Sequence, residues 1–520
     1  MRAPCTPAVD GRPANHNTRP GVTMTVAWSE KDRHQLDARG ISIDAADQQL
    51  RMLRQPSHHP HLIRPGRVDD GIQQIPERDH GRLLEIHHHA AQRGRWSKFV
   101  PASGAASRMF AWKDPQDLRR LAEHLDRFAF YAELESVASR NGHTLSELRA
   151  THDDATLEAL LLGESGLGLS ELPKALLPFH AYGSTNRTSF EEHLREAAAC
   201  FADHQQQCHA HFTVSPEHQH RFENWLVSLV RDLRSEIGVR LDVGFSQQKP
   251  STDLLALDQQ GEPLRDDDGS LVFRPGGHGA LLENLSDLGA DLVFVKNVDN
   301  IAHANRRAVA DHWIKVLGGY LIHLQTEIHR CLASLQTTQD VQAWRDADPL
   351  LHHAFTGLID EDADSTDPAQ QRQRLQQRLD RPLRICGVVP NEGEPGGGPF
   401  WVRQSDQSLS LQIIESAEVA PQDPDQQEIF AAATHFNPVF MALGLRDAAD
   451  RPYPLQDYVD NQRFFLTSKT AAGQPIRVLE RPGLWNGSMA DWNTVFVEVP
   501  QAVFSPVKTV FDLLRPEHQP

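Results

Sequence analysis

The chain has 520 residues, of which 39% are hydrophobic and 23% are charged, and its formal net charge is −18. A negative chain repels a phosphate backbone, which excludes non-specific binding of nucleic acid but allows a local basic pocket for a small phosphorylated ligand. No run of about 18 apolar residues is present, so we expect no membrane span. The length predicts a globular protein of two or three domains.

The N-terminal residues 1–23 have no apolar middle of the kind that a signal peptide needs, and we expect a disordered tail there. Met24 begins the first patterned stretch and is an alternative start of the protein. The five cysteines are scattered without a C-x-x-C pair, which is typical of reduced thiols in the cytoplasm.

Residues 24–95 are expected to be mainly helical, because "SIDAADQQLRMLRQ" places apolar residues three and four apart after a Ser or Asp cap. The segment is also rich in histidine, which suggests either a metal cluster or solvated polar positions. Adjacent histidines on a helix point in different directions and no Cys or Asp stands at ligand spacing, so we favour solvated positions. The histidines are His58, His59, His61, His87, His88 and His89.

From residue 96 to about 330, apolar strand patterns alternate with helical ones, which predicts an α/β core with a mixed, mostly parallel sheet flanked by helices. Residues 111–162 read as helices inside this core. Residues 331–382 are expected to form a helical segment and linker. Strand patterns return in 383–520, which we expect to form a C-terminal α+β lobe that completes the site.

The stretch "KFVPASGAASRMF" predicts a short apolar strand that stops in small residues and runs into a helix. Such a turn exposes backbone N–H groups and a helix dipole that bind phosphate, and an arginine at its end adds a fork-shaped donor. A plain strand-to-helix turn with a surface arginine is the alternative. The candidate phosphate-binding residues are Ser103, Gly104, Ala105, Ala106, Ser107 and Arg108.

Two further stretches carry candidate ligand contacts. In "LPKALLPF", Lys174 stands in an apolar frame where it would place an ammonium over a phosphate, or it is an ordinary surface lysine. In "RPGGHGALLENL", a glycine-rich loop precedes a helix and would let the backbone approach a flat or phosphorylated ligand, or it is a structural turn. Its residues are Gly276, Gly277, His278 and Gly279.

"LVFVKNVDN" predicts a buried strand with Asp299 just past its carboxyl end. In open α/β sheets, ligands bind at this end of the strands. An aspartate there is a candidate Mg²⁺ ligand, because Mg²⁺ takes one or two carboxylates together with substrate phosphates. The alternative is that Asp299 caps the following helix.

In this order, these elements resemble the nucleotide-diphospho-sugar transferase superfamily, which has a Rossmann-like GT-A fold. Within this superfamily, the chain most resembles the UDP-sugar and UDP-N-acetylhexosamine pyrophosphorylases. Their A-G-G-x-G-T-R-[LM] loop corresponds to "ASGAASRM", and Pro173-Lys174 corresponds to their P-K element. "FSQQKP", "RPGGHG", "NVDN" and "FSPVK" follow in the family's order. The chain also resembles a bacterial family known only as a domain of unknown function.

The resemblance implies a nucleotidyltransferase that joins a nucleoside triphosphate to a sugar 1-phosphate and releases pyrophosphate. It implies that the 103–107 loop cradles the triphosphate and that Arg108, Lys174 and Lys508 act on the phosphates. It further implies that Gln247 and the 276–279 loop contact the base and ribose, and that Asp299 ligates Mg²⁺. Its partners would be small molecules, with UTP as the first candidate nucleotide, and not nucleic acid or a membrane.

Two departures from the family pattern concern the loop and its spacing. Ser103 and Ala106 stand where the family has glycine. Lys174 follows Arg108 much later than in the family, which makes 111–162 an inserted helical unit that would form a lid or an interface.

Three other functions remain as alternatives. They are a glycosyltransferase of the same fold, a catalytically silent nucleotide-binding protein, and a structural or interaction protein.

Overall fold

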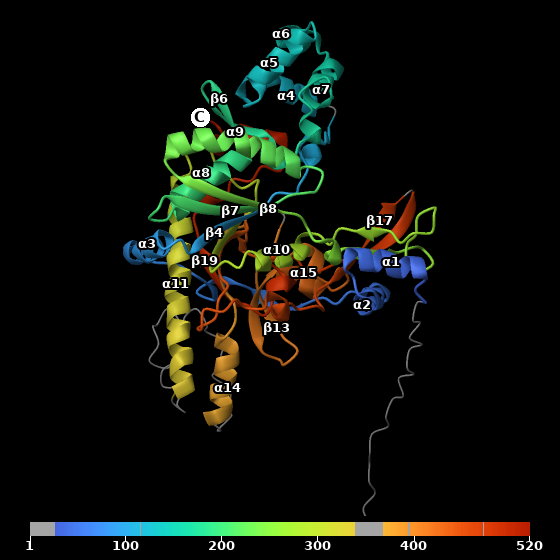
Figure 1. The fold of residues 1–520 in the computed structure, drawn as a ribbon. Coiled ribbons are helices and arrows are strands. Elements are labelled where there is room, and N and C mark those ends of the chain that lie inside the picture. The colour runs from blue at the N-terminus through green and yellow to red at the C-terminus, as the bar shows by residue number, and fades with distance from the viewer. Residues whose placement is uncertain (1–26, 115, 338–367, 394–395, 472) are drawn as a thin grey trace, which may run out of the picture.

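A computed structural model describes residues 27–114, 116–337, 368–393, 396–471 and 473–520 (Figure 1). The expected tail at 1–23, Met24 and most of the expected linker around 360–371 lie outside these described residues.

The centre of the fold is a ten-stranded sheet (Figure 1). Its strands are β2 (Arg67–Val68), β3 (Gly71–Gln73), β4 (Trp96–Pro101), β7 (Gln207–Thr213), β8 (Arg240–Ser246), β11 (Leu292–Lys296), β12 (Leu383–Pro390), β15 (His435–Phe436), β16 (Phe440–Gly444) and β19 (Asn493–Glu498). Their order is β2-β3-β19-β12-β16-β11-β4-β7-β8, with β15 paired to β12. Along this order only the two pairs made by β16 are antiparallel. The expectation of a mixed, mostly parallel α/β sheet is confirmed.

Both faces of this sheet are covered, which is why its central strands are almost entirely apolar. In β11, Leu292 and Phe294 enter one buried cluster, and Val293 and Val295 enter another on the opposite face. The helices against the first face are α3 (Glu77–Gln92), α8 (Ser189–Phe201), α9 (Gln219–Ile237) and α11 (Ala308–Thr337), and α10 (Leu281–Asp287) lies against the second.

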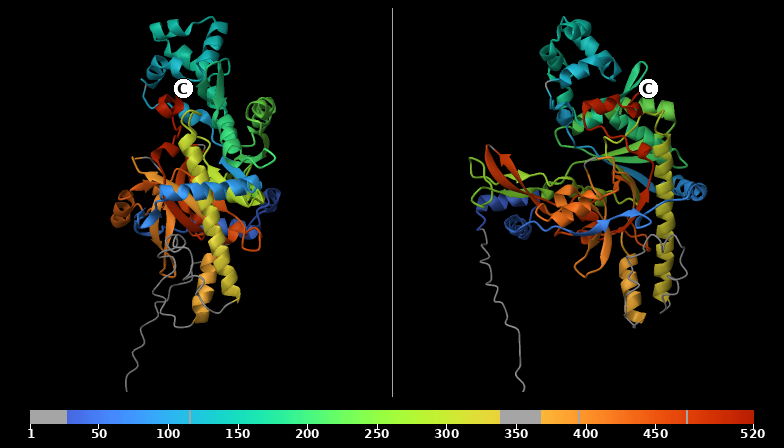
Figure 2. Two further views of the ribbon diagram at one scale, coloured as in Figure 1. Left: turned by 90° about the vertical axis from the view of Figure 1, so that its left-hand side faces the viewer. Right: turned by 180° about the vertical axis from the view of Figure 1, so that it is seen from behind.

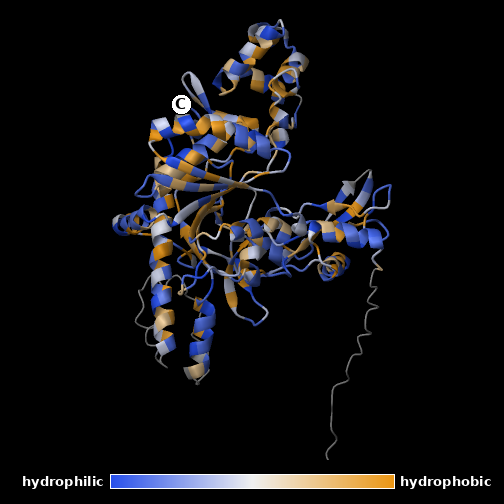
Figure 3. Cartoon of the chain, in the orientation of Figure 1, coloured by the Kyte–Doolittle hydropathy of each residue, from blue (hydrophilic) through white to orange (hydrophobic). Residues whose placement is uncertain are grey.

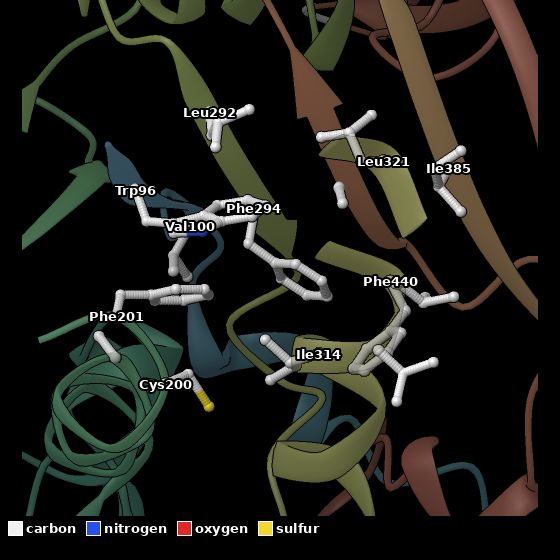
Figure 4. Close-up of a cluster of buried hydrophobic side chains, with 14 of the residues drawn as sticks. Trp96, Val100, Cys200, Phe201, Leu292, Phe294, Ile314, Leu321, Ile385 and Phe440 are labelled. Carbon is white, nitrogen blue, oxygen red and sulfur yellow. The ribbon is translucent and has the colours of Figure 1, made fainter. Parts of the chain in front are cut away.

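Aromatic side chains fill the first face (Figure 4). The Phe294 ring lies 4.9 Å from that of Phe440 in an edge-to-face arrangement and 6.1 Å from that of Phe201 on α8. Trp96 stacks on Phe201 at 5.4 Å. Each such buried ring contributes roughly 1.5–3 kcal/mol to stability, so this cluster holds the strands and helices that position the site.

Helices α3 and α11 approach each other closely because α11 carries two consecutive glycines at the crossing. A Cβ on Gly319 would lie only 2.0 Å from the Leu83 carbonyl oxygen, and one on Gly318 would lie 2.7 Å from the His87 ring. His87 is buried and stacked on Trp96. The expectation of a solvated position is therefore wrong for His87, because this turn of α3 faces the core.

The N-terminal segment begins with α1 (Glu30–Arg39) and α2 (Ile43–Arg54), and the Ser42 hydroxyl caps α2 as expected. Residues 61–73 are not helical, however. They form β1 (His61–Pro65) and the sheet strands β2 and β3. β1 pairs with β13 (Gly398–Arg403), which pairs with β14 (Leu409–Ile414). These partners are remote in sequence, so a local pattern does not reveal them.

The inserted segment is helical, as expected, and projects from one end of the molecule in every view (Figures 1 and 2). It contains α4 (Asp117–Glu123), α5 (Tyr131–Arg140), α6 (Leu145–Thr151) and α7 (Asp154–Leu162). Apolar and polar residues are interspersed along these helices (Figure 3), because their apolar sides pack into a cluster separate from the sheet core, which they share with segments outside the insertion.

Residues 383–520 contribute β12, β15, β16 and β19 to the same sheet as β4 and β11. They also contain α15 (Pro424–Ala431), and the mostly hydrophilic α14 (Pro368–Leu379) precedes them (Figure 3). A second sheet has the order β10 (Phe273–Arg274), β9 (Leu254–Leu257), β18 (Gln474–Glu480) and β17 (Phe465–Ala471). A hairpin joins β5 (Pro178–Tyr182) to β6 (Thr185–Thr188).

Within the described residues, no helix combines the length and the apolar character that crossing a bilayer would need. The four described cysteines, Cys200, Cys208, Cys331 and Cys386, are all free thiols and buried.

Candidate active site

The loop after β4 is fixed at both of its ends. The Ala102 N–H donates to the Thr213 carbonyl of β7 at 2.8 Å, and the Ala106 N–H donates to the Leu172 carbonyl at 3.0 Å. The Lys174 N–H in turn donates to the Gly104 carbonyl at 2.9 Å. The backbone therefore places the Lys174 segment directly beside the loop, although a long insertion separates the two in sequence.

The middle of this loop is open to solvent. Ser103, Gly104 and Ala105 are exposed, and no described residue accepts a hydrogen bond from their backbone N–H groups. Arg108 is also exposed, and its guanidinium pairs with no residue in the described ranges. A row of open N–H donors with a nearby unpaired arginine is a suitable environment for an anion.

The element after the loop differs from the expected helix. It is a five-residue 3-10 helix, Ala106–Phe110, and not an α-helix, so any helix dipole at the loop is small. Neither Ser103 nor Ala106 has a positive φ. The loop therefore needs no glycine at the two positions where it departs from the family pattern, and Ala106 instead packs its methyl group into the insertion core.

Gly104 offers a test of the loop that is separate from stability. Its φ is not positive, and a Cβ placed on it would meet nothing within 4 Å. We expect Gly104→Ala to leave the melting temperature within about 1 °C, because nothing in the folded chain is displaced. If phosphate contacts the loop backbone, the same change weakens nucleoside triphosphate binding by about tenfold or more, measured by titration calorimetry. Unchanged binding would contradict this role of the loop.

Asp299 follows β11 and joins two lysines from remote segments. Its Oδ2 accepts from the Lys174 ammonium at 2.8 Å and from the Lys508 ammonium at 3.0 Å. The Asp299 and Lys174 side chains are each 12% exposed, whereas that of Lys508 is 58% exposed. Asp299 caps no helix, because the next one, α11, begins only at Ala308. Lys174 is therefore a mostly buried lysine paired with a carboxylate and not an ordinary surface one.

Charge and burial oppose each other at this ion pair. Burial raises the pKa of the Asp299 carboxyl, but the two ammonium groups more than offset this effect and hold that pKa below its usual value. Burial lowers the pKa of Lys174, and the attraction of Asp299 only partly restores it. The cluster brings one carboxyl group together with two lysines, and this excess of basic over acidic groups favours an anionic ligand.

A buried charge network that we did not predict lies beneath this edge of the sheet. Glu196 of α8 accepts from Lys98 of β4 and from Lys296 of β11, each at 2.6 Å, and all three side chains are at most 1% exposed. On the same helix, His193 lies 3.1 Å from the Val298 carbonyl oxygen, next to Asp299. The sequence signal that could have revealed this network is the lysine inside each of two otherwise apolar strand patterns. A lysine buried in such a strand requires an oppositely charged or hydrogen-bonding partner.

The expected nucleoside-binding residues lie farther along the same edge. Gln247 is exposed, and its amide donates to Gln219 at 2.8 Å. It is connected to the loop after β4 through β7, since the Ala102 N–H donates to the Thr213 carbonyl of β7 and Thr213 pairs with Ser246 of β8. The side-chain amide of Asn284 donates to Ser246 Oγ and to the Gln247 carbonyl, both at 2.8 Å, and thereby ties the middle of α10 to the end of β8.

The glycine-rich loop 276–279 packs against the segment that contains Trp485. The His278 ring stacks on Trp485 at 4.4 Å, and its Nδ1 accepts the Leu484 N–H at 3.1 Å. A Cβ on Gly279 would lie 2.1 Å from a carbonyl oxygen of this segment, so close packing requires that glycine. Gly277 is exposed with a φ of 72°, whereas Gly276 is buried. The His278 side chain thus anchors the loop to the C-terminal lobe.

No group of three or more His, Cys, Asp or Glu side chains is placed to hold a metal ion within the described part of the chain. Asp299 Oδ2 is taken by the two lysines, while no described residue donates a hydrogen bond to its Oδ1. The protein therefore offers one carboxylate oxygen at this position, which is compatible with Mg²⁺ only if phosphates and water supply the other ligands.

Sequence comparison identifies the family. Residues 29–519 match the model of a family described as a domain of unknown function, DUF4301. The chain belongs to this family. No curated protein matches the chain significantly in sequence.

Solved structures with a similar arrangement include two pyrophosphorylases. A Leishmania major UDP-glucose pyrophosphorylase mutant in complex with UDP-glucose is 13% identical, with a TM-score of 0.45, over 94% of this chain and 78% of that one. A Trypanosoma brucei UDP-N-acetylglucosamine pyrophosphorylase in complex with an inhibitor is 13% identical, with a TM-score of 0.48, over 94% of this chain and 79% of that one.

Proposed function

We propose that this DUF4301 protein is a nucleotidyltransferase that joins a nucleoside triphosphate to a sugar 1-phosphate and releases pyrophosphate. The observation that supports this function best is the convergence of the open loop 103–105, Lys174, Asp299 and Lys508 at the carboxyl ends of β4 and β11. These groups come from four separate segments. Together they supply N–H donors and ammonium groups, which are the groups that bind and neutralise phosphates.

The chemistry needs positioning and charge neutralisation, and no covalent nucleophile on the protein. The sugar phosphate oxygen attacks the α-phosphorus in line, and the bond to the leaving pyrophosphate breaks. In this proposal the loop N–H groups hold the triphosphate and Arg108 neutralises the leaving pyrophosphate. Lys174 and Lys508 exchange their contacts with Asp299 for contacts with phosphate oxygens, which places their charge where negative charge develops.

The proposal also specifies the nucleotide, the metal ion and the cellular location. UTP is the first candidate nucleotide, because the order of the motifs resembles that of the UDP-sugar pyrophosphorylases. Asp299 would hold Mg²⁺ through Oδ1, and the ion would neutralise phosphate charge. The four free, buried cysteines support a location in the cytoplasm.

A substrate panel tests the proposal. The purified protein is incubated with each nucleoside triphosphate, each of several sugar 1-phosphates and Mg²⁺, and pyrophosphate release is recorded. We expect at least one pair to release pyrophosphate well above the background of Arg108→Ala, because that variant loses the unpaired guanidinium of the loop. Pyrophosphate release at the same rate by the wild type and Arg108→Ala would refute the role of Arg108. Release by neither protein with any pair would refute the proposed nucleotidyltransferase function.

Melting curves in the same panel separate the remaining alternatives. A nucleotide-dependent rise in melting temperature without pyrophosphate release would indicate a silent nucleotide-binding protein. No shift with any nucleotide would favour a structural or interaction protein. The glycosyltransferase alternative needs a separate assay with a sugar nucleotide and an acceptor, in which transfer of the sugar without pyrophosphate release would support it.

A further inference from the structure

Residues 505–520, here called the C-terminal segment, bring Lys508 to Asp299. The Lys508 side chain is 58% exposed, and an exposed ion pair contributes too little to hold a chain segment in place. The backbone provides part of the docking, because the Val507 N–H donates to the Asp299 carbonyl at 3.0 Å and the Ser505 N–H donates to Asn300 Oδ1 at 2.9 Å. The other contacts of the segment include apolar and polar contacts with the helical insertion.

Apolar residues of the C-terminal segment complete the core of the helical insertion. Val507, Val510 and Leu513 are buried in the same cluster as Leu121 and Leu125. This cluster also contains Ala106, Met109 and Phe110, which flank Arg108 in sequence. The backbone that carries Arg108 and the backbone that carries Lys508 are therefore packed against one apolar core, which belongs largely to the insertion.

Polar contacts reinforce this packing at one residue of the insertion. Arg127 Nη2 donates to the Leu514 carbonyl at 2.7 Å, and its Nε donates to Gln519 Oε1 at 3.3 Å. In return, Gln519 Nε2 donates to the Arg127 carbonyl at 3.2 Å. Nearby, the Arg120 guanidinium lies 4.4 Å from the centre of the Phe511 ring. Arg127 itself is exposed, so these contacts and not burial account for its place in the structure.

We infer that Arg127 is a positioning residue for Lys508, and that the helical insertion serves to hold the C-terminal segment so that this lysine reaches the phosphates. Arg127 contacts no reacting group in this arrangement and acts only through the segment. The catalytic part of the inference rests on the proposed nucleotidyltransferase function, whereas the structural part does not.

The first measurement is hydrogen exchange of the C-terminal segment, which requires no substrate. We expect Arg127→Ala to speed exchange of the amides of 507–514 by about tenfold, because hydrogen bonds to Leu514 and Gln519 are lost. The matched control is Arg119→Ala, since Arg119 is an exposed insertion arginine whose ion pair with Asp154 stays within the insertion. Equal exchange in the wild type and Arg127→Ala would overturn the inference.

The second measurement is kcat/KM for pyrophosphate release in a double-mutant cycle. We expect Arg127→Ala to lower kcat/KM by about tenfold, Arg127→Lys to recover part of the loss, and Arg119→Ala to match the wild type. The double variant Arg127→Ala with Lys508→Ala should be no slower than Lys508→Ala alone. Additive losses would overturn the positioning role, because Arg127 would then act independently of Lys508.

The two measurements separate the failure of this inference from that of the proposed function. If the wild-type protein releases no pyrophosphate, the proposed function fails, and the exchange experiment still decides whether the insertion holds the segment. Gln519→Ala provides a second variant at the same contact, because it removes the partner side chain while leaving Arg127 in place. It should speed exchange of 507–514 in the same direction, and normal exchange in this variant would count against the inference.

Discussion

Lys174→Met is expected to lower the rate of pyrophosphate release by about 10²- to 10³-fold while the protein stays folded. Lys174 is the most enclosed lysine of the proposed site, bound to Asp299 at 2.8 Å and linked through its own N–H to the Gly104 carbonyl of the loop after β4. A preorganised cation in a partly buried site stabilises developing charge far more than a solvated one does. Methionine retains much of the side chain's volume, so the loss reports the charge.

The comparison variant is Lys469→Met, which removes a lysine from an exposed ion pair with Glu480 on β17 and β18. This variant should release pyrophosphate at the wild-type rate. The role proposed for Lys174 fails if Lys174→Met retains full activity, or if its melting temperature falls so far that the protein is unfolded at the assay temperature. Circular dichroism of both variants supplies that check.

Glu196→Ala is expected to destabilise the protein by about 3–5 kcal/mol, because it leaves two buried ammonium groups without their carboxylate. Lys98 and Lys296 are both within 2.6 Å of Glu196 and nearly inaccessible to solvent. Burial already lowers the pKa of Lys98, and the two lysines hold that of Glu196 well below its usual value. Urea denaturation of both proteins measures the difference in the free energy of unfolding.

Replacing the whole network tests whether the missing partner is the cause. In the triple variant Lys98→Met, Glu196→Leu and Lys296→Met, no buried charge is left unpaired, so much of the lost stability should return. Equal stability of Glu196→Ala and the wild type would show that the network adds nothing to the fold. A triple variant as unstable as Glu196→Ala would point to the shape of the site and not to its charge.

The sequence alone predicted the class of fold and the position of two candidate site segments within it. Apolar strand patterns alternating with helical ones predicted the mixed, mostly parallel sheet, because strands covered on both faces must be apolar throughout. The same patterns placed the loop around Gly104 and the carboxylate of Asp299 just after β4 and β11. Since β4 and β11 are parallel neighbours, the residues that follow them lie at one edge of the sheet.

Other features depend on contacts between remote segments, which a local pattern does not encode. β1 lies in a segment that was expected to be mainly helical. Its partner, β13, lies in the C-terminal lobe, so the local pattern did not reveal the strand. His87 appeared solvated because the local pattern did not show that its turn of α3 packs against Trp96. Likewise, the stacking of His278 on Trp485 depends on a segment far along the chain.

The sequence by itself determined which residues can carry charge to the carboxyl edge of the sheet, since residue type and strand pattern are local properties. Only the tertiary structure decided which charges meet. In the folded chain, Lys174 and Lys508 both form ion pairs with Oδ2 of Asp299, and Glu196 forms ion pairs with the buried Lys98 and Lys296. The physical reason is that an ion pair depends on the distance between side chains in space, and packing of remote segments sets that distance.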